Sequence, residues 1–291
     1  MRKPIIFFSL FAVVLCLATS SIMIKFCTAP AAIIALYRLF FIAVIIGTVQ
    51  AGSVFRGFQT LSRQDLRRII AAGVFLALHL AFWMQSLKYT SISSSVLFTN
   101  LQVIFVFMFS LLILKEKLNS KLVVGVVIAL GGSIIIGSGD LVHGKIFGDL
   151  LALASGLFIA IYLAVGKDIR SRVNIMTYTV LVSIAACLVL LIFTVTNGIP
   201  LFAYPQNDWL IFVLNALLPG IGGHLVLNWV LKYVKAPVAS VSVLGETVGA
   251  SLLAYLIFNE ALLWYQVAGG LFILSGIVLA AFSEADPSNY E

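Results

Sequence analysis

Ten apolar runs, each long enough to cross a membrane, follow one another along the 291-residue chain. A helix needs roughly 20 mainly apolar residues to span the hydrocarbon core of a bilayer. In these runs apolar residues occur on every side of such a helix, so it has no polar face to turn toward water. The sequence therefore predicts an all-α integral membrane protein with ten transmembrane helices, at about 4–26, 30–50, 67–87, 92–114, 121–138, 148–167, 174–196, 208–231, 237–258 and 262–282.

The composition excludes an ordinary soluble domain. Hydrophobic residues make up 62% of the chain, charged residues 10%, and the mean hydropathy is +1.14. Soluble domains carry roughly 25% charged residues, and a soluble protein of this length has no core large enough for so much apolar surface. The net charge of +7 does not indicate nucleic-acid binding, because the basic residues are scattered singly. The three cysteines are widely spaced, which predicts neither a disulfide framework nor a metal site.

The basic residues predict how the chain is oriented in the membrane. Cytoplasmic loops are enriched in Lys and Arg, and the ten spans place alternate loops on opposite sides. With a cytoplasmic N-terminus, fourteen basic residues fall inside: Arg2, Lys3, Arg56, Arg63, Arg67, Arg68, Lys115, Lys117, Lys121, Lys167, Arg170, Arg172, Lys232 and Lys235. Three fall outside, namely Lys25, Lys88 and Lys145. This bias predicts a multi-pass protein of the plasma membrane with both termini in the cytoplasm.

The second half of the chain repeats the first at an offset of 144 residues. The tripeptide Leu-Lys-Tyr at 87–89 recurs at 231–233, and residues 87–137 show 11 identities in 51 positions without a gap. Chance similarity between apolar helices reaches about this level, but here each match also falls on the corresponding helix or loop. Each half holds five predicted spans, an odd number, so the second half enters the membrane the other way up. The sequence thus predicts two inverted five-helix repeats, 1–143 and 144–291, an architecture typical of transporters.

Four segments carry a resemblance to a known family. They are ALHLAFWMQSLKYTSISSS, Lys-Glu-Lys-Leu followed by VVGVVIALGGSIIIG, GHLVLNWVLKYV, and LGETVGASLLAYLIFNEALLWYQVAGGLFILSGIVL. With Glu116 and Glu260 closing the fourth and ninth spans, the chain resembles the EamA-type branch of the drug/metabolite transporter superfamily. The resemblance implies a carrier whose central cavity is formed by spans 1–4 and 6–9, with spans 5 and 10 packed outside. It leaves the substrate open, because members handle amino acids, sugars, nucleotide derivatives and toxic cations.

Two charged residues lie deep inside predicted spans. Glu246 is about nine residues into the ninth span, roughly 13 Å along its axis, and Arg38 is about eight residues into the second. A charge near the bilayer centre costs at least roughly 2.5–3.5 kcal/mol. One interpretation makes Glu246 a proton or cation site, because burial favours the neutral carboxyl group, and makes Arg38 an anchor for an anionic group of the substrate. The alternative is that the two form a structural salt bridge, or that each has another polar partner.

Further polar and aromatic residues are candidates to line the cavity. The repeat offset places Gln102 opposite Glu246, so that one half presents an amide where the other presents an acid. Asn100 lies close by in the same span. His79 and Trp83 are four residues apart, as are His224 and Asn228, so each pair shares one helix face. The histidines could bind substrate, shuttle protons or only bond a neighbouring helix. Trp83 and Trp229 could form aromatic platforms for a substrate. The candidate binding or coupling residues are Glu246, Arg38, His79, Trp83, Asn100, Gln102, His224, Asn228 and Trp229.

These features predict a secondary active transporter rather than an enzyme. The leading hypothesis is an exporter of small metabolites or amino acids, with protons as the candidate coupling ion at Glu246. The alternative is an obligate exchanger of anionic solutes, of the sugar-phosphate or nucleotide-phosphate type, that uses Arg38. We find no phosphate-binding loop, nucleophile elbow or metal-ligand spacing, so neither a catalytic residue, a metal nor a cofactor is predicted. The expected partners are a small-molecule substrate and the lipid bilayer, without nucleic acid.

Overall fold

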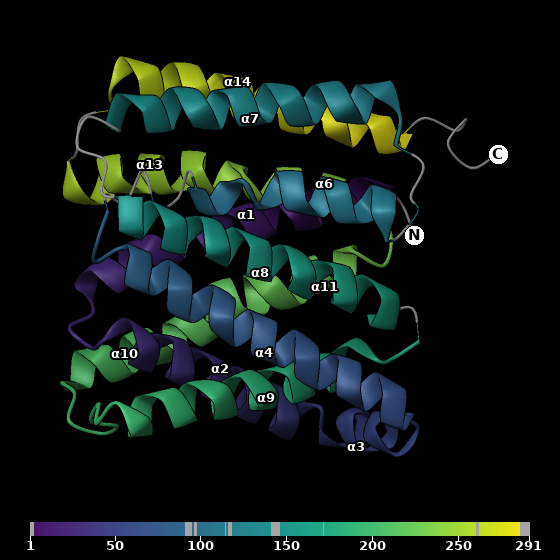
Figure 1. The fold of residues 1–291 in the computed structure, drawn as a ribbon, viewed down its shortest axis with the longest axis vertical. Helices are drawn as coiled ribbons and strands as arrows, with labels where there is room; N and C mark the ends of the chain where they lie inside the picture. The colour runs from purple at the N-terminus through teal and green to yellow at the C-terminus, as the bar shows by residue number, and fades with distance from the viewer. Residues whose placement is uncertain are drawn as a thin grey trace.

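The computed structural model describes residues 3–90, 95, 98–113, 115, 118–140, 146–170, 172–259 and 262–285, and these residues form helices and connections without a strand. The family-typical Glu116 and Glu260 lie outside the described residues. Figure 1 shows the helices stacked side by side with their axes close to parallel. Those of the first half are α1 (Lys3–Phe26), α2 (Ala31–Val49), α3 (Ala51–Gln59), α4 (Arg63–Ser86), α6 (Gln102–Leu112) and α7 (Ser120–Asp140). Those of the second half are α8 (Ile146–Arg170), α9 (Ile175–Thr196), α10 (Gln206–Asn215), the π-helix η2 (Ala216–Leu225), α11 (Val226–Val230), α12 (Ala236–Val243), α13 (Gly245–Phe258) and α14 (Trp264–Ala285).

The prediction of an all-helical membrane protein is confirmed. Eight helical segments within the described residues are long and apolar enough to cross a membrane. Two shorter apolar helices, Phe98–Leu112 and Ser120–Ile136, lie where the fourth and fifth spans were predicted. Large apolar side chains such as Phe8, Phe202 and Phe282 lie exposed on the outside. Such a surface suits a surrounding of lipid, because hydrocarbon does not penalise exposed apolar groups as water does.

Helix α3 was not predicted. The sequence indicated a loop between the second and third spans, yet residues 51–59 form a short helix with exposed Phe55 and Phe58. Glycines at positions 52 and 57 weaken the helical signal in this segment. Packing supports the helix instead, because Gly57 allows α3 to approach Thr177 of α9 closely. Tertiary contact thus overrides a weak local propensity here.

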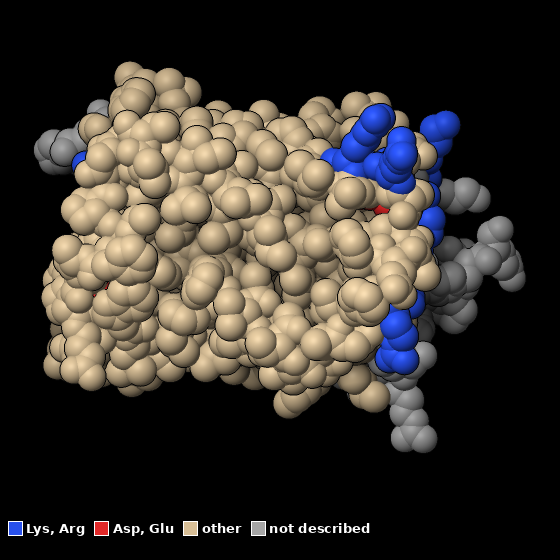
Figure 2. All heavy atoms as spheres, turned by 90° about the horizontal axis from the view of Figure 1, so that it is seen from below, with Lys and Arg blue, Asp and Glu red and all other residues tan. Residues whose placement is uncertain are grey.

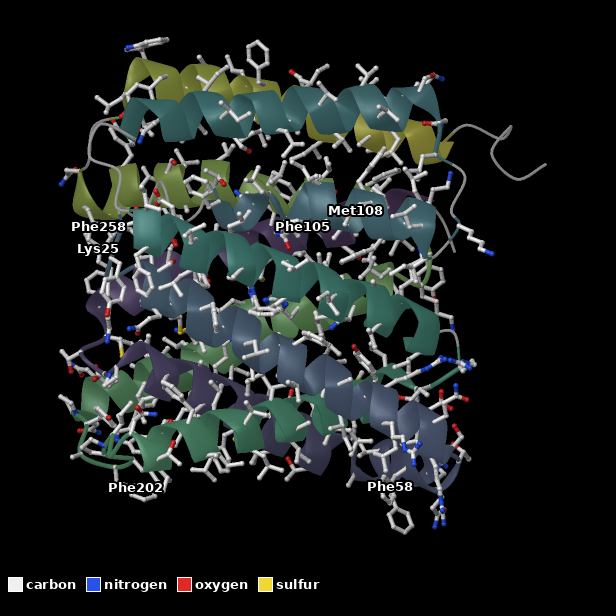
Figure 3. The ribbon with its side chains drawn as sticks, in the orientation of Figure 1. Lys25, Phe58, Phe105, Met108, Phe202 and Phe258 are labelled. Atoms are coloured by element: carbon white, nitrogen blue, oxygen red, sulfur yellow. The ribbon has the colours of Figure 1, made fainter. Side chains whose placement is uncertain are left out.

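Basic side chains gather at one end of the molecule, called here the basic end. Helix α1 begins and α14 ends at this end (Figure 1). Figure 2 shows Lys and Arg side chains clustered there on the face that it displays, while most of that face is apolar. At the opposite end, Lys25 lies over the ring of Phe258 at 4.2 Å from its centroid (Figure 3). The gathering of basic side chains at one end agrees with the sequence-based expectation that most Lys and Arg residues lie in loops on one side of the membrane.

Helices α7 and α14 form a pair at the edge of the stack, outside the other helices (Figure 1). A Cβ atom on Gly125 would lie 2.8 Å from the carbonyl oxygen of Gly276, and one on Gly132 would lie 2.5 Å from that of Gly269. Small residues permit this close approach of two helix backbones within a membrane. Gly125 and Gly132 are each 144 residues from Gly269 and Gly276 respectively, so the repeat-related glycines meet crosswise, as two equivalent helices related by a twofold axis do.

The backbone also repeats at the end of α6 and α13. Two non-glycine residues have a positive φ in the described part of the chain, Lys115 at 52° and Asn259 at 53°. They are 144 residues apart. A left-handed residue commonly ends a helix, and a non-glycine residue there costs energy. Residues at equivalent positions of the repeat therefore share this conformation, although Asn is suited to it and Lys is not.

The glycine contact predicts a sharp difference between two neighbouring substitutions in α7. Gly132→Ala should lower the thermal stability of the purified protein in detergent, since its methyl group would strike the α14 backbone, and overpacking costs about 1–3 kcal/mol. Gly131→Ala should leave stability unchanged or slightly raised, because no atom lies within 4 Å of its added Cβ. Melting curves followed by tryptophan fluorescence measure both. Equal melting temperatures for the two variants would show that α7 and α14 do not pack through these glycines.

Candidate functional site

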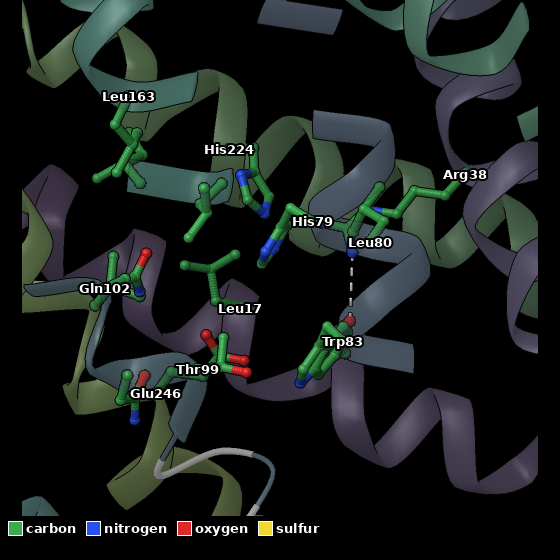
Figure 4. Close-up of a pocket in the computed structure, with 15 residues that line it drawn as sticks. Leu17, Arg38, His79, Leu80, Trp83, Thr99, Gln102, Leu163, His224 and Glu246 are labelled. Carbon is green, nitrogen blue, oxygen red and sulfur yellow. Dashed lines mark hydrogen bonds between the residues drawn. The ribbon is translucent and has the colours of Figure 1, made fainter. Parts of the chain in front are cut away.

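A small cavity of about 70 Å³ lies between the two halves of the chain. Its walls come from α1, α2, α4 and the segment 98–102 of the first half, and from α8, η2, α11, α12 and α13 of the second. None of its lining residues belongs to α7 or α14, which agrees with the implied position of these helices outside the cavity. Figure 4 shows the residues around this space. The lining residues are Leu17, Ser20, Arg38, His79, Leu80, Trp83, Thr99, Asn100, Gln102, Ile159, Leu163, His224, Leu227, Val243 and Glu246.

The structure brings together seven of the nine candidate residues at this cavity. Arg38, His79, Trp83, Asn100, Gln102, His224 and Glu246 all line it. Asn228 lines a neighbouring cavity of about 20 Å³, which shares Arg38, Leu80 and His224 with the first. Trp229 lines neither cavity and instead packs on Tyr233, with ring centroids 5.3 Å apart. Sequence reasoning missed Ser20 and Thr99, because hydroxyl residues in apolar helices commonly bond their own backbone and give no distinct signal.

Arg38 and Glu246 form no ion pair within the part of the chain that the structure describes. The Arg38 side chain is 3% exposed, and its Nη1 donates a long hydrogen bond of 3.5 Å to Ser20 Oγ. The Ser20 hydroxyl donates in turn to Asn215 Oδ1 at 3.4 Å. No described group donates a hydrogen bond to the carboxylate of Glu246. Figure 4 shows the two charged side chains coming from different sides of the site. The geometry thus leaves one cationic and one acidic group facing a shared space, without the direct salt bridge considered above.

The two histidines differ in their partners. His79 Nδ1 lies 2.8 Å from Ser155 Oγ and 3.2 Å from the Ser155 carbonyl oxygen, and Ser155 Oγ also donates to the His79 carbonyl oxygen. These contacts join α4 to α8. His224 Nδ1 is buried and has no hydrogen-bond partner among the described residues. Since buried polar atoms are normally bonded, the Nδ1 atom of His224 has bonding capacity left for a ligand or water.

In each half of the chain, one helix is interrupted beside the cavity. In the first half the helix is interrupted at Leu101, before α6 begins at Gln102, and in the second half at Leu244, between α12 and α13. At both places the backbone bonds shorten to i→i−3, from Ile104 to Leu101 and from Thr247 to Leu244. Gln102 and Glu246 each lie directly beside one of these interruptions. Discontinuous helices at a midplane site are a known feature of transporters.

Two side-chain hydrogen bonds hold helices together around the site, one between the halves and one within the second half. Asn100 Nδ2 donates to Thr247 Oγ1 at 2.9 Å, linking the two interrupted spans. Asn228 donates to the hydroxyl of Tyr162, which holds α11 to α8. Asn100 therefore both lines the cavity and joins the halves, a double role that the sequence did not distinguish. No group of three or more His, Cys, Asp or Glu side chains suited to a metal ion occurs among the residues described.

Among the further polar contacts that link the halves, two lie outside the cavity at opposite ends of the molecule. At the basic end, Arg172 of the second half lies 3.4 Å from Asp65 of the first. At the opposite end, Asp208 of the second half accepts hydrogen bonds from the backbone N–H and the hydroxyl of Thr28, at 3.2 and 2.7 Å. Thr28 and Arg172 are 144 residues apart, and Asp65 and Asp208 are 143 apart. The two contacts, called here the basic-end link and the opposite-end link, are therefore equivalent under the repeat.

The links differ in burial. Asp208 is 1% exposed, whereas the side chains of Arg172 and Asp65 are 49% and 15% exposed. An exposed ion pair contributes about 0–1 kcal/mol, while hydrogen bonds to a buried charged group contribute about 1.5–3 kcal/mol each. The opposite-end link is thus the stronger of the two in this structure.

Comparison with known proteins identifies the class. Two segments of the chain, residues 4–138 and 146–282, match the EamA-like transporter family. The matches cover nearly the whole sequence, so the chain belongs to this family of membrane transporters. The double match agrees with the two-repeat architecture.

Curated relatives carry only general names. An uncharacterized transporter of Archaeoglobus fulgidus is 27% identical over 217 residues, which cover 74% of this chain and 78% of the relative. The uncharacterized transporter YetK of Bacillus subtilis is 22% identical over 86% of this chain and 78% of its own. One crystal structure superposes with a TM-score of 0.75 over 96% of this chain and 98% of its own, at 17% identity. This last similarity shows the shared fold alone.

The different partners of the histidines predict different effects on stability. His79→Ala should lower the free energy of unfolding by about 1–3 kcal/mol more than His224→Ala does, because it removes a bonded buried group and leaves Ser155 short of a partner. Both substitutions remove the same side-chain volume, so each serves as the control for the other. Thermal or denaturant unfolding of the purified variants measures the difference. A larger loss for His224→Ala would contradict the assigned hydrogen bonds.

Proposed function

We propose that this protein is a secondary active exporter of small metabolites or amino acids that exchanges its substrate for protons at Glu246. The observation that carries the proposal is the position of Glu246 at a cavity between the halves, where it has neither an ion pair nor a hydrogen bond from any described group. A carboxylate without a committed partner can gain and lose a proton as the occupancy of the cavity changes. Arg38, on the same cavity, supplies a fixed positive charge for an anionic group of the substrate.

The proposal includes ten spans in two inverted repeats, with both termini in the cytoplasm and the protein in the plasma membrane. The crosswise contact of Gly125 and Gly132 with Gly276 and Gly269 supports the inverted relation. The basic end supports the orientation, because positively charged segments are retained on the cytoplasmic side. In this arrangement the basic end faces the cytoplasm and the opposite end faces outward.

Alternating access would use the two links between the halves. Breaking the Arg172–Asp65 contact opens the cytoplasmic side, and breaking the bonds of Asp208 to Thr28 opens the outer side. A carrier must not open both sides together, and two equivalent contacts at opposite ends of one site suit that requirement. The π-helix η2 supports the same motion, since π-helical turns often occur at functional sites and η2 contains Pro219 and the cavity residue His224.

Proton movement in proteoliposomes tests the coupling. The full chain is reconstituted with a lumenal pH dye, and amino acids, sugars, nucleotide derivatives and organic cations are added one class at a time. One class should trigger proton movement, and Glu246→Gln should reduce it to the level of empty liposomes, because an amide cannot release a proton. Glu246→Asp, which keeps the carboxyl group, should retain part of the activity. Equal melting temperatures for the unmodified protein and the two variants would show that reduced proton movement does not come from misfolding.

Two outcomes would redirect the assignment. If Glu246→Gln transports with unchanged proton movement and pH dependence, Glu246 is not the coupling site. If no solute moves protons but a labelled anionic solute still exchanges, and Arg38→Gln abolishes that exchange, the protein is the anion exchanger considered above. Arg38 suits that role as well, since its guanidinium group has five N–H donors and, among the described residues, it donates only to Ser20.

A second experiment tests the opposite-end link through Cys27, the neighbour of Thr28. Burial raises the pKa of the Cys27 thiol to about 11, so its reactive thiolate is scarce at neutral pH. Thr28→Val removes the hydroxyl donor to Asp208 and should increase the labelling rate of Cys27 by a membrane-impermeant maleimide at pH 7.5 several-fold. Arg172→Gln, which breaks the basic-end link, should not. Thr48→Val is a matched control, because Thr48 bonds only carbonyl groups of its own helix. Equal labelling in Thr28→Val and the unmodified protein would rule out this link as a barrier to opening.

A further inference from the structure

Helix α3 is held against α9 in a defined orientation. A Cβ on Gly57 would lie 2.1 Å from Thr177 Oγ1, so only glycine permits this approach. Thr177 is fully buried, and its hydroxyl reaches the carbonyl oxygens of Ser53 and Val54 at 3.5 Å. The side of α3 that carries Gly57 therefore faces the protein. The other side is exposed, with Phe55 at 63% and Phe58 at 49%, and Figure 3 shows Phe58 pointing away from the helices.

An open groove of about 610 Å³ runs between the end of α2, helix α3 and helix α9, and we call it the α3 groove. Its lining is apolar and includes Phe55 and Phe58 of α3 and Val180 and Ile184 of α9. The groove has open space beside Gly52, because no atom lies within 4 Å of a Cβ added at this position. The groove opens outward beside exposed apolar surface, where an acyl chain of the surrounding lipid can enter it.

The segment that forms and follows α3 is strongly basic. Residues 51–70 contain four arginines and one acidic residue, Asp65. Asp65 is already paired, because it accepts from Ser62 Oγ at 2.6 Å and contacts Arg172. Arg56, Arg63 and Arg67 are exposed, and no described acidic group pairs with them. Figure 2 shows the basic side chains gathered at the end of the molecule where α3 lies.

We propose that the α3 groove binds one anionic phospholipid, with an acyl chain along the groove and the phosphate held by Arg56 and its neighbouring arginines. The charge of the segment selects the occupant: guanidinium groups bind phosphate by paired hydrogen bonds, and basic segments beside a membrane bind anionic headgroups. A neutral lipid would fill the groove without engaging the arginines. A free anion would engage the arginines without filling the groove. The site is independent of the transport cavity and of the proposed proton coupling.

Native mass spectrometry of the full chain in detergent tests the site with phosphatidylglycerol and with phosphatidylcholine of the same acyl chains. One phosphatidylglycerol should be retained and phosphatidylcholine should not. Arg56→Gln should lower that retention about fivefold, the factor that corresponds to roughly 1 kcal/mol per basic residue near an anionic surface. Gly52→Leu should lower it as well by filling the groove, and this position has room for a side chain. Lys88→Gln, which removes a basic residue from the opposite end, should leave retention unchanged.

Three results would overturn the proposal. Equal retention of both lipids would show that charge does not select the occupant. Competition by inorganic phosphate as effective as that by phosphatidylglycerol would make the arginines a simple anion site. A dimer that Gly52→Leu converts to a monomer would show that a second copy of the chain covers the groove.

Discussion

The absence of water in the hydrocarbon core governs this structure. Every backbone polar group must find its partner within the protein, which accounts for the helices and for the apolar exterior. The same constraint makes each buried charge costly, and Arg38 and Glu246 lie at a cavity that other polar side chains also line. The cavity thus reflects the lipid surroundings as well as the fold, because it keeps charged and polar side chains away from hydrocarbon.

Duplication explains how a single site arises from two similar halves. Helices α7 and α14 meet through repeat-related glycines at the edge, and the interrupted spans meet at the cavity through Asn100 and Thr247. The halves are alike in backbone but not in side chains, since Gln102 occupies the position equivalent to Glu246. An asymmetric pair lets one half carry a titratable group while the other supplies a neutral donor and acceptor. A symmetric pair of acids would instead repel when both were charged.

Much of the helix arrangement could be predicted from the sequence, because apolar runs and loop charges are direct consequences of the lipid environment. The interruptions at Leu101 and Leu244 could not, since neither place carries a proline and the surrounding residues are good span formers. Polarity inside an apolar run marked several of the candidates that line the cavity, such as Glu246 and His224. Trp229 lines neither cavity, and the sequence could not distinguish His79, which contacts Ser155, from His224, whose Nδ1 has no partner among the described residues.

The π-helix also accounts for an irregularity in the repeat. The equivalent residues Asp65 and Asp208 are 143 apart, whereas Leu87 and Leu231 are 144 apart, so the second half holds one extra residue between these points. A π-helical turn takes up one more residue than an α-helical turn, because its hydrogen bonds run from i to i+5. The structure places η2, Ala216–Leu225, within this interval. The extra residue is thus absorbed beside the cavity without shifting Asp208 or Leu231. His224 lies within η2 and is 145 residues from His79, so the two histidines are not strict equivalents under the repeat. Their hydrogen bonds differ as well, since His79 Nδ1 contacts Ser155 whereas His224 Nδ1 has no partner among the described residues.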